Sequence, residues 1–240
     1  FCPMAIEVFN RYEKKYLITD EQFSQIQSKI IEFMDPDKFN KNGQAYSICN
    51  LYYDTENDEL IRNSIEKPTY KEKLRLRGYG IPQLQDTVYL EIKKKFNGKV
   101  NKRRSSFTLE EAYKYIDNQK YPLQKSKPNI QVLKELEYFL NFYKLQPKVY
   151  IYYERFAYFA KNDNDFRITF DTNIKTRRTD LQLEKGSNGS TLLPENMWLM
   201  EAKSSNSFPL WFCELLSDNK IYSSSFSKYG TEYKNYLINT

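Results

Sequence analysis

Charged and apolar residues alternate along several stretches of the chain, a pattern typical of β-strands with one face in a core. In the stretch YKEKLRLRGY, which begins at position 70, Lys73, Arg75 and Arg77 alternate with Leu74 and Leu76. A period of two, or a high content of β-forming residues, predicts further strands at 11–17, 45–53, 88–95, 148–157, 166–171 and 197–203.

Helical periodicity marks other stretches. Asp20 is expected to cap a helix whose apolar face includes Phe23 and Ile26. Thr108 and Glu111 have the spacing of a capping box that opens a helix over 109–116. Further helices are expected at 54–63, 130–143, 209–216 and 226–237, and loops at 35–42, 125–129, 162–165 and 184–195. None of the loops has the composition of an interdomain linker, so we predict one domain over residues 1–240.

The charged sides of six predicted strands raise the question of which side faces the core. They carry the residues Arg11/Glu13/Lys15, Lys73/Arg75/Arg77, Glu91/Lys93/Lys95, Arg155, Arg167/Asp171 and Glu201/Lys203. A solvated sheet face gives this pattern too. However, the positions between the charged residues include Tyr12, Tyr16, Tyr152 and Lys94, which are not uniformly typical of a core. The charged positions themselves are mostly clustered lysines and arginines, whereas a solvated face would mix several polar residue types. A closed or nearly closed barrel with these cations inside would need a polyanion and a metal to offset their repulsion.

The amino-acid composition limits which groups could carry out catalysis. The 240 residues include no histidine, which excludes a Ser-His-Asp triad, a Cys-His dyad and histidine-based metal sites. Catalysis would use carboxylates, lysine, arginine, tyrosine or a metal held by oxygen ligands. Three widely spaced cysteines fit a reducing compartment. The net charge of +6 favours anionic partners mildly.

Location is the next question. No run of about 18 apolar residues is present, and the first residues, FCPMAIEV, lack the apolar core of a signal peptide. We expect a cytoplasmic protein without a membrane segment in this chain. Flanking membrane or sensor domains in a longer natural protein, which could hold it at the cytoplasmic face of a membrane, stay open.

Eight short motifs follow one another along nearly the whole chain. They are RYEKKYLI at 11–18, SICNLYYDTEND at 47–58, KLRLRGYG at 73–80, YLEIKKK at 89–95, YYERFAYF at 152–159, FRITFDTNI at 166–174, WLMEAKS at 198–204 and FSKYGTE at 226–232. In these motifs the chain resembles the triphosphate tunnel metalloenzymes. Within that superfamily it is similar to the polyphosphate polymerase domain of the vacuolar transporter chaperone complex and its bacterial relatives.

The resemblance implies an α+β fold, an antiparallel eight-stranded β-barrel with helices packed around the outside. It also implies that the barrel lumen binds triphosphate, ATP and polyphosphate together with Mn²⁺ or Mg²⁺. The positions that match the family's phosphate-binding residues are Lys15, Lys73, Arg75, Arg77, Lys93, Arg155, Arg167, Lys203 and Lys228. We expect catalysis to be carried by Lys15, Arg75, Arg77, Lys93, Arg155, Arg167 and Glu201.

Glu201 matches the family's metal-binding glutamate, with a salt-bridge partner of the cations as the alternative. Glu13 is a second candidate metal ligand. Glu13 and Glu91 either assist the metal or orient Lys15 and Lys93. The basic run 102–104 is expected to be a solvated loop, with help to an emerging chain as the alternative.

Two departures from the family pattern bear on activity. Hydrolases and cyclases of the superfamily open with Glu-x-Glu-x-Lys, but here Arg11 stands at the first glutamate. The polymerase has a further lysine where this chain has Ser225, which weakens the expected grip on product. The first change favours a polymerase over a simple triphosphatase.

The resemblance therefore predicts an ATP-dependent, divalent-metal-dependent polyphosphate polymerase. It would transfer the γ-phosphate of ATP to a growing polyphosphate chain. The alternatives are an inorganic or nucleoside triphosphatase on the same fold, and a non-catalytic polyphosphate-binding module. Nucleic acid is not an expected partner, because the tyrosines lie within predicted strands and form no base-stacking motif.

Overall fold

A computed structural model of the chain describes residues 8–9, 12–40, 43–97, 99–118, 130–163 and 165–239. These residues separate into two compact units. Unit 1 lies within Phe1–Phe9, Ile48–Ile151 and Thr176–Asn188, and unit 2 lies within Asn10–Ser47, Tyr152–Lys175 and Gly189–Thr240. Three strands, β4 (Tyr46–Asp54), β8 (Gln146–Ala160) and β9 (Arg167–Arg177), have residues in both units. The prediction of a single domain stays a prediction.

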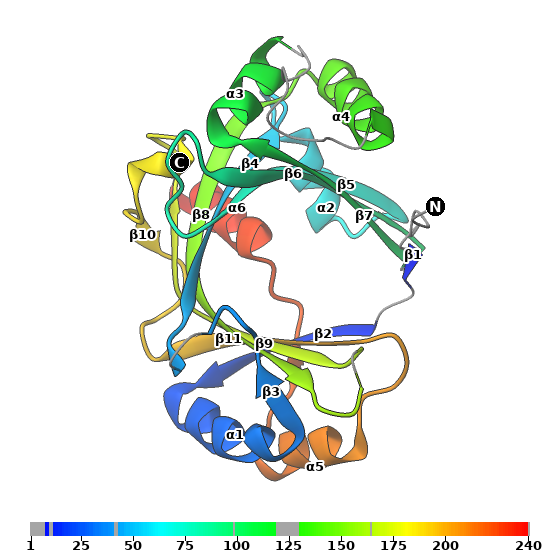
Figure 1. Cartoon of the computed structure of the whole chain (residues 1–240), viewed down its shortest axis with the longest axis vertical. Coiled ribbons are helices and arrows are strands. Elements are labelled where there is room, and N and C mark those ends of the chain that lie inside the picture. The colour runs from blue at the N-terminus through cyan, green and yellow to red at the C-terminus, as the bar shows by residue number, and fades with distance from the viewer. Residues whose placement is uncertain are drawn as a thin grey trace. The chain divides into compact units, whose positions relative to one another are not determined.

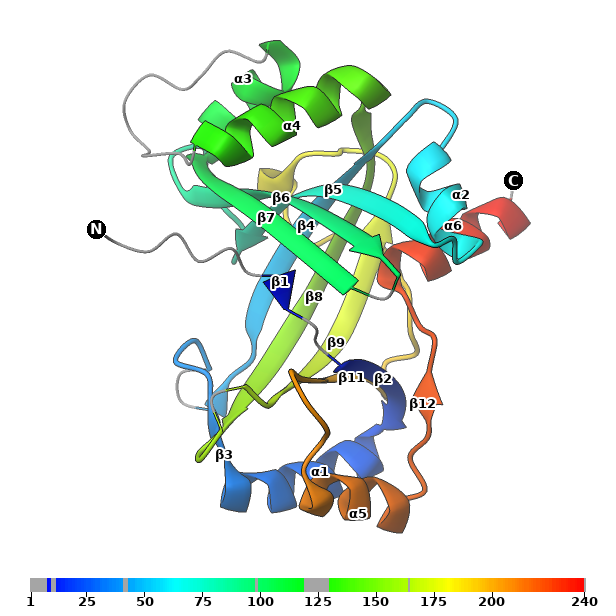
Figure 2. The ribbon, with the colours of Figure 1, turned by 90° about the vertical axis from the view of Figure 1, so that its right-hand side faces the viewer.

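Unit 1 is an antiparallel sheet with helices on one face. Strand β5 (Tyr70–Tyr79) pairs with β4 and with β6 (Thr87–Phe96), and β6 pairs with β7 (Lys99–Thr108). The short strand β1 (Val8–Phe9) adds to the far side of β7 (Figure 2). Helices α3 (Leu109–Asn118) and α4 (Ile130–Tyr143) lie over this sheet (Figure 1).

The core of unit 1 lies between these helices and the sheet. Leu74, Leu76, Leu90 and Ile92 are all 0% exposed. From the helix side the same core is filled by Leu109, Ala112, Tyr115, Leu133, Leu136 and Phe139. Unit 1 also contains α2 (Glu59–Ile65), which packs on β5, and the 3-10 turn η2 (Leu183–Lys185). The leucine side of YKEKLRLRGY is therefore the core side.

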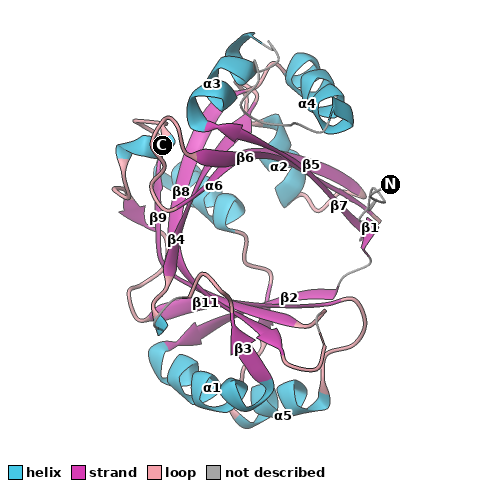
Figure 3. Cartoon of the chain, in the orientation of Figure 1, coloured by secondary structure: helices cyan, strands magenta, loops and turns pink. Residues whose placement is uncertain are grey.

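Unit 2 repeats this arrangement with other elements. Strand β11 (Met197–Ser204) lies between β9 and β2 (Tyr12–Thr19), and β12 (Ser223–Ser224) pairs with β2. Short strands β3 (Met34–Pro36) and β10 (Ser190–Thr191) pair with β8 and β9. Helices α1 (Asp20–Phe33) and α5 (Leu210–Asp218) cover one face of this sheet (Figure 3). The last helix is α6 (Lys228–Asn239).

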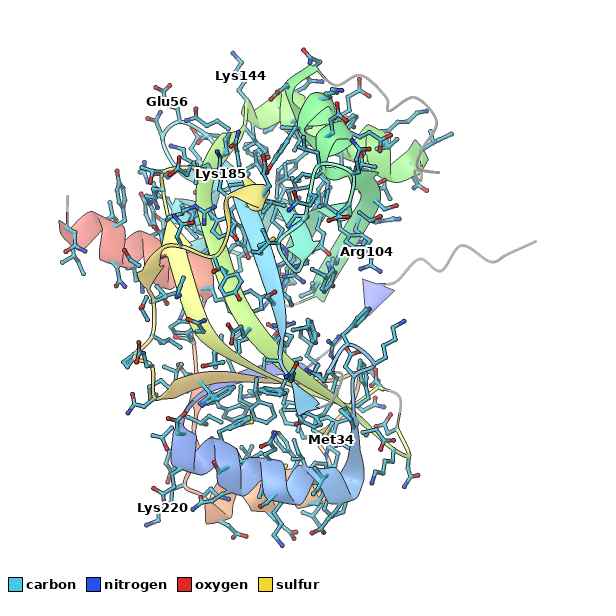
Figure 4. The ribbon with its side chains drawn as sticks, turned by 60° about the vertical axis from the view of Figure 1, so that its left-hand side comes forward. Met34, Glu56, Arg104, Lys144, Lys185 and Lys220 are labelled. Atoms are coloured by element: carbon cyan, nitrogen blue, oxygen red, sulfur yellow. The ribbon has the colours of Figure 1, made fainter. Side chains whose placement is uncertain are left out.

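The core of unit 2 is rich in aromatic rings. Strand residues of this core include Tyr16, Ile18, Ile168, Phe170, Met200 and Ala202, and they meet Phe23, Ile26, Ile30, Phe212 and Leu216 of the two helices. Side chains fill the space between α1 and the strands, where Met34 is 1% exposed (Figure 4). The indole of Trp198 stacks on the ring of Phe23 at 3.9 Å between centroids. None of the described helices is long and apolar enough to cross a membrane.

Helix starts are set by local hydrogen bonds. The capping box predicted at Thr108 is confirmed: the Glu111 N–H donates to Thr108 Oγ1 at 3.2 Å, and the Thr108 N–H donates to Glu111 Oε2 at 2.9 Å. The cap predicted at Asp20 is wrong by one residue. Thr19 caps α1 in a box with Gln22, and Asp20 instead accepts a hydrogen bond from Trp198 Nε1 at 2.6 Å.

The predicted barrel needs correction. The described strands form one antiparallel sheet of 12 strands, whose order runs as an open path from β1 to β12, and closure is not confirmed. Eight strands have eight residues or more, and the other four have two or three.

Three loop predictions also change. The basic run 102–104 lies in β7, so the loop expected there is wrong. The predicted loop 35–42 begins inside β3, and 184–195 contains part of η2 and β10. The predicted loop 125–129 lies outside the described residues.

Candidate functional site

The face of the unit 1 sheet that points away from α3 and α4 carries three cross-strand rows of polar side chains, which we call the cationic face. Directly opposed residues of an antiparallel sheet share a face. The rows are Asn50–Arg77–Tyr89–Ser106, Tyr52–Arg75–Glu91–Arg104 and Lys73–Lys93–Lys102. Among these described residues, six are lysine or arginine and one, Glu91, is acidic. Like charges directly opposite each other repel, so the row of three lysines favours an anionic ligand.

Glu91 is the counter-ion at the centre of this face. Its side chain is 1% exposed, and Arg75 Nε donates to Glu91 Oε2 at 2.7 Å. Lys102 Nζ forms an ion pair with Glu91 Oε1 at 2.6 Å. Burial alone would raise the pKa of Glu91, but Arg75, Arg77 and Lys102 hold it well below its ordinary value. Glu91 therefore stays ionised and holds Arg75 in place, and its expected role beside the metal or Lys93 stays a prediction.

Arg75 and Arg77 are held by neutral groups as well. Arg75 Nη1 donates to Tyr52 Oη at 3.2 Å, and Arg77 Nε donates to Asn50 Oδ1 at 2.9 Å. Asn50 in turn donates to the carbonyl oxygen of Ile151 at 3.2 Å. These contacts fix both guanidinium planes before any ligand arrives, so little side-chain entropy remains to be lost on binding.

The excess of cations changes the acidity of neighbouring groups. Burial lowers the pKa of Lys102 to about 7, and Arg75 and Arg77 add to this effect while Glu91 opposes it. Burial would raise the pKa of Tyr52, yet Arg75, Lys73 and Arg77 lower it to about 8. Arg104, labelled in Figure 4, lies with its guanidinium carbon 4.8 Å from the centre of the Tyr89 ring.

In unit 2 the face of β2, β11 and β9 that points away from α1 and α5 also carries charge, and we call it the mixed-charge face. In the β2/β11 register Glu201 lies opposite Lys15, and Lys203 lies opposite Glu13. Lys203 Nζ is 2.9 Å from Glu201 Oε1 and 4.0 Å from Glu13 Oε2, and Lys15 Nζ is 3.7 Å from Glu13 Oε1. Positive and negative groups thus alternate across the two strands.

Glu201 is the more enclosed of the two carboxylates. Its side chain is 10% exposed, against 26% for Glu13. Burial would raise the pKa of Glu201, but Lys203, Lys15, Arg155 and Lys228 hold it well below its ordinary value. Glu201 is therefore held in its ionised form by the surrounding cations and offers carboxylate oxygens on this face.

Asp171 of β9 accepts hydrogen bonds from two of the predicted cations, Arg155 and Lys228. Arg155 of β8 donates to both carboxylate oxygens, at 2.6 Å from Nε and 2.8 Å from Nη2. Lys228, the first residue of α6, donates to Asp171 Oδ2. Both cations lie against the ring of Tyr153, at 5.1 Å for the Arg155 guanidinium and 4.3 Å for Lys228 Nζ. Burial opposes ionisation of Asp171, but Arg155 and Lys228 lower its pKa to about 2.

The face of β9 that carries Asp171 also carries two further polar residues, Arg167 and Thr169. Arg167 lies opposite Lys203, with Nη2 3.7 Å from Asp37 Oδ2 and its guanidinium carbon 4.7 Å from the Phe159 ring centre. Thr169 lies opposite Glu201. Thr169 is 3% exposed, and its hydroxyl oxygen has no hydrogen-bond partner among the described residues.

Every predicted site residue lies on one of the two faces or bonds to it. The cationic face of unit 1 carries Lys73, Arg75, Arg77 and Lys93, and unit 2 carries Glu13, Lys15, Arg155, Arg167, Glu201, Lys203 and Lys228. Arg11 lies outside the described residues. The sequence prediction counted Asp171 among the charged strand residues without giving it a role in the site, and it expected Lys102 in a loop. A strand at 99–108 would have pointed to Lys102, and the alternation Arg167-x-Thr169-x-Asp171 already placed Asp171 with the cations.

The oxygen donors of the mixed-charge face suit a hard divalent cation. No group of three or more Asp, Glu, Cys or His side chains around one point occurs in the parts of the chain that the structure describes. Mg²⁺ in phosphate-handling sites commonly uses one or two carboxylates and takes its other ligands from water and phosphate. Glu201 and Glu13, which flank Lys203, meet that requirement.

A family model described as the VTC domain matches residues 10–237. The chain belongs to the VTC domain family. Among curated proteins, this VTC domain is similar to vacuolar transporter chaperone complex subunit 4 of Schizosaccharomyces pombe, with 26% identity over 202 residues. The match covers 75% of this chain and 28% of that protein, so the chain spans less than a third of its relative's length.

Two solved structures resemble the VTC domain in fold. A candidate adenylate cyclase from Bacillus halodurans has a TM-score of 0.56 and 14% identity, covering 92% of this chain and 94% of that one. A candidate adenylyl cyclase from Hippeastrum, described as having a dominant triphosphatase activity, has a TM-score of 0.53 and 15% identity, covering 93% and 95%. At such identities the likeness concerns the fold alone. It supports the α+β fold class that the sequence predicted.

Proposed function

We propose that this VTC domain is a polyphosphate polymerase that uses ATP and a divalent cation. A terminal phosphate oxygen of the polyphosphate chain would form a bond to the γ-phosphorus of ATP. The bond from that phosphorus to the β–γ bridging oxygen would break, and ADP would leave with the electron pair. The attacking oxygen is already ionised, so the step needs no protein base, which suits a chain without histidine.

The cationic face is the observation that carries this proposal. Its guanidinium groups are fixed by Glu91, Tyr52 and Asn50, and its three lysines lie in one row. Arginine donates two parallel hydrogen bonds to a phosphate, and lysine adds a compact charge. Groups fixed in this way stabilise negative charge that spreads over phosphoryl oxygens in the transition state.

The mixed-charge face of unit 2 has a proposed role of its own. Lys15, Arg155, Arg167, Lys203 and Lys228 add positive charge for phosphate, and we assign to Glu201 and Glu13 the task of holding Mn²⁺ or Mg²⁺. When bound, the divalent cation neutralises phosphate oxygens and makes the phosphorus a better electrophile. Glu201 would also keep Lys203 in place through their 2.9 Å contact.

A second candidate activity is hydrolysis of triphosphate or nucleoside triphosphate. Two retained carboxylates, Glu13 and Glu201, favour it, because a cation held there lowers the pKa of a bound water. The third candidate, a non-catalytic polyphosphate-binding module, needs the cations and has no use for Glu201.

One assay separates the three candidates. Pure protein is incubated with γ-labelled ATP and Mn²⁺, and the products are resolved by gel and by phosphate release. A polymerase gives a ladder of labelled polyphosphate, a hydrolase gives free phosphate as its only labelled product, and a binding module leaves ATP intact. The Glu201→Gln variant tests the carboxylate's role: turnover should fall while binding of metal-free polyphosphate persists. Free phosphate as the sole product would refute the polymerase proposal.

A further inference from the structure

Thr169 is a buried hydroxyl without a visible purpose in the fold. Its side-chain oxygen has no hydrogen-bond partner among the described residues, and the residue is only 3% exposed. Burying an unpaired hydroxyl costs free energy, so such groups are uncommon and call for an explanation such as a bound ion or ligand. A valine would fit the same strand position without this cost.

The position of Thr169 points to a ligand. In the β9/β11 register it lies directly opposite Glu201, on the mixed-charge face. Opposed residues of an antiparallel pair have Cβ atoms about 4.5–5.5 Å apart, so the hydroxyl and the Glu201 carboxylate can reach one common atom. Two residues further along β9, the Asp171 carboxylate is already taken up by Arg155 and Lys228.

The chemistry of this pair of oxygens favours a cation. Beside a carboxylate that stays ionised, a neutral hydroxyl oxygen adds a second hard donor without adding charge. Serine and threonine hydroxyls serve in this way in phosphoryl-transfer sites, where they ligate the Mg²⁺ that accompanies the phosphates. Because lysines and arginines crowd this face, the cation would arrive together with its phosphates.

We propose that Thr169 is a ligand of the divalent cation, contributing its hydroxyl oxygen beside Glu201. The inference rests on the proposed function, because the cation is the one that accompanies triphosphate or polyphosphate. It makes Thr169 a residue kept at a cost in stability because the metal complex needs it.

Two variants of Thr169 and one control separate a ligand from a structural residue. Thr169→Val keeps the branched shape and removes the oxygen, and Thr169→Ser keeps the oxygen. Ser105 of β7 supplies the control: its hydroxyl also has no partner among the described residues and it is 4% exposed, but it lies in register with Leu90 on the helix-covered side of its sheet.

Isothermal titration calorimetry gives the affinity for tripolyphosphate with saturating Mn²⁺ and again with EDTA. The ratio of the two affinities measures the contribution of the metal. Thr169→Val is expected to lower this ratio at least about tenfold, as loss of a metal-site group does. Thr169→Ser and Ser105→Ala should keep the wild-type ratio. Thermal unfolding should show Thr169→Val at least as stable as the wild type, since an unpaired buried hydroxyl has been removed.

Each contrary result overturns the inference in a different way. An unchanged ratio for Thr169→Val means that the hydroxyl does not touch the metal. An equal loss with EDTA means that it binds phosphate instead. A lower melting temperature for Thr169→Val means that the hydroxyl has a partner in the protein. If the wild type binds no tripolyphosphate under either condition, the proposed function fails together with this inference.

Discussion

The guanidinium of Arg155 donates two hydrogen bonds to the carboxylate of Asp171, at 2.6 and 2.8 Å, in a pair whose side chains are 10% and 0% exposed. Lys228 shares the same carboxylate. Removing one member of a buried ion pair leaves the other charge without compensation. We therefore expect Asp171→Asn to lower the free energy of unfolding by about 3 kcal/mol, measured by urea denaturation.

The dependence of the unfolding free energy on pH in the acid range tests the same Arg155–Asp171 pair. The folded-state pKa of Asp171 is about 2, against an ordinary value of 3.8, so its contribution is complete above about pH 4 and is lost as the pH falls toward 2. The difference between wild type and Asp171→Asn should shrink over that range. The control is Asp218→Asn, which changes an exposed carboxylate at the end of α5 and should leave stability unchanged. Equal effects of the two changes would contradict the buried pair.

Arg75 and Arg103 provide a matched comparison for binding. Arg75 lies on the cationic face, whereas Arg103 lies on the opposite side of its sheet, 3.8 Å from Glu135 of α4. Arg75→Met should weaken tripolyphosphate binding by about 10- to 100-fold, which corresponds to the loss of charge-assisted hydrogen bonds. Arg103→Met removes the same charge and should leave the affinity nearly unchanged. Equal losses would mean that net charge alone sets the affinity.

Leu76 tests the other side of the same strand. It is 0% exposed beneath the unit 1 helices, so Leu76→Ala should cost about 2–5 kcal/mol of unfolding free energy. Tripolyphosphate affinity per folded molecule should stay at the wild-type value, because the cationic face keeps its side chains. Denaturation and calorimetry on the same preparation measure both quantities. A variant with normal stability and lost binding would reverse the assignment of the two faces.

Lys102 should couple ligand binding to proton uptake. With a pKa of about 7 in the free protein, it is mostly neutral at pH 8, although the 39% of its side chain that stays exposed lets solvent screen part of the effect. In the free protein the neighbours of Lys102 are three cations, Arg75, Arg77 and Lys93, and one carboxylate, Glu91. A bound phosphate adds negative charge beside Lys102 and therefore raises its pKa. Binding therefore takes up a proton, and affinity falls as the pH rises through 7.

The proton count can be measured directly. Calorimetric titrations at pH 8 in Tris and in HEPES give the protons taken up from the dependence of the heat on the buffer. Lys102→Arg keeps the charge in a group that does not titrate, so this variant should take up fewer protons than the wild type. The same proton count in both proteins would show that Lys102 is charged before the ligand binds.

The elements with a clear period were predicted well from the sequence. Helix α4 was predicted with its observed bounds, 130–143, and strands β5, β6, β8 and β11 were predicted within about three residues of their ends. Strand β9 begins as predicted but continues to Arg177, beyond the predicted end at 171. Strand β5 shows the pattern most clearly, with Leu74 and Leu76 buried on one side and cations on the other, whereas β8 is buried on both sides over 149–153 and was predicted from its β-forming residues. The pattern also placed the cations on one face of each sheet, because a slip by one residue would expose every leucine.

Strand β7 was missed for a physical reason. Its run Lys102-Arg103-Arg104 puts charge on both faces of the sheet, so no alternation shows. The structure accommodates Arg103 on the helix side by pairing it with Glu135. The sequence of β7 alone does not contain this partner, because Glu135 lies on a helix that follows later in the chain. Likewise, strands of two or three residues, such as β1 and β12, are too short to carry a period.

The excess of six lysine and arginine side chains over one carboxylate on the cationic face has a practical consequence for handling the protein. Such a surface holds a cloud of small anions, and these must be released whenever a polyanion binds. Affinities for phosphate chains should therefore fall steeply as salt is added. Preparations made at low salt will retain cellular polyanions, so a high-salt wash must come before any binding constant is measured.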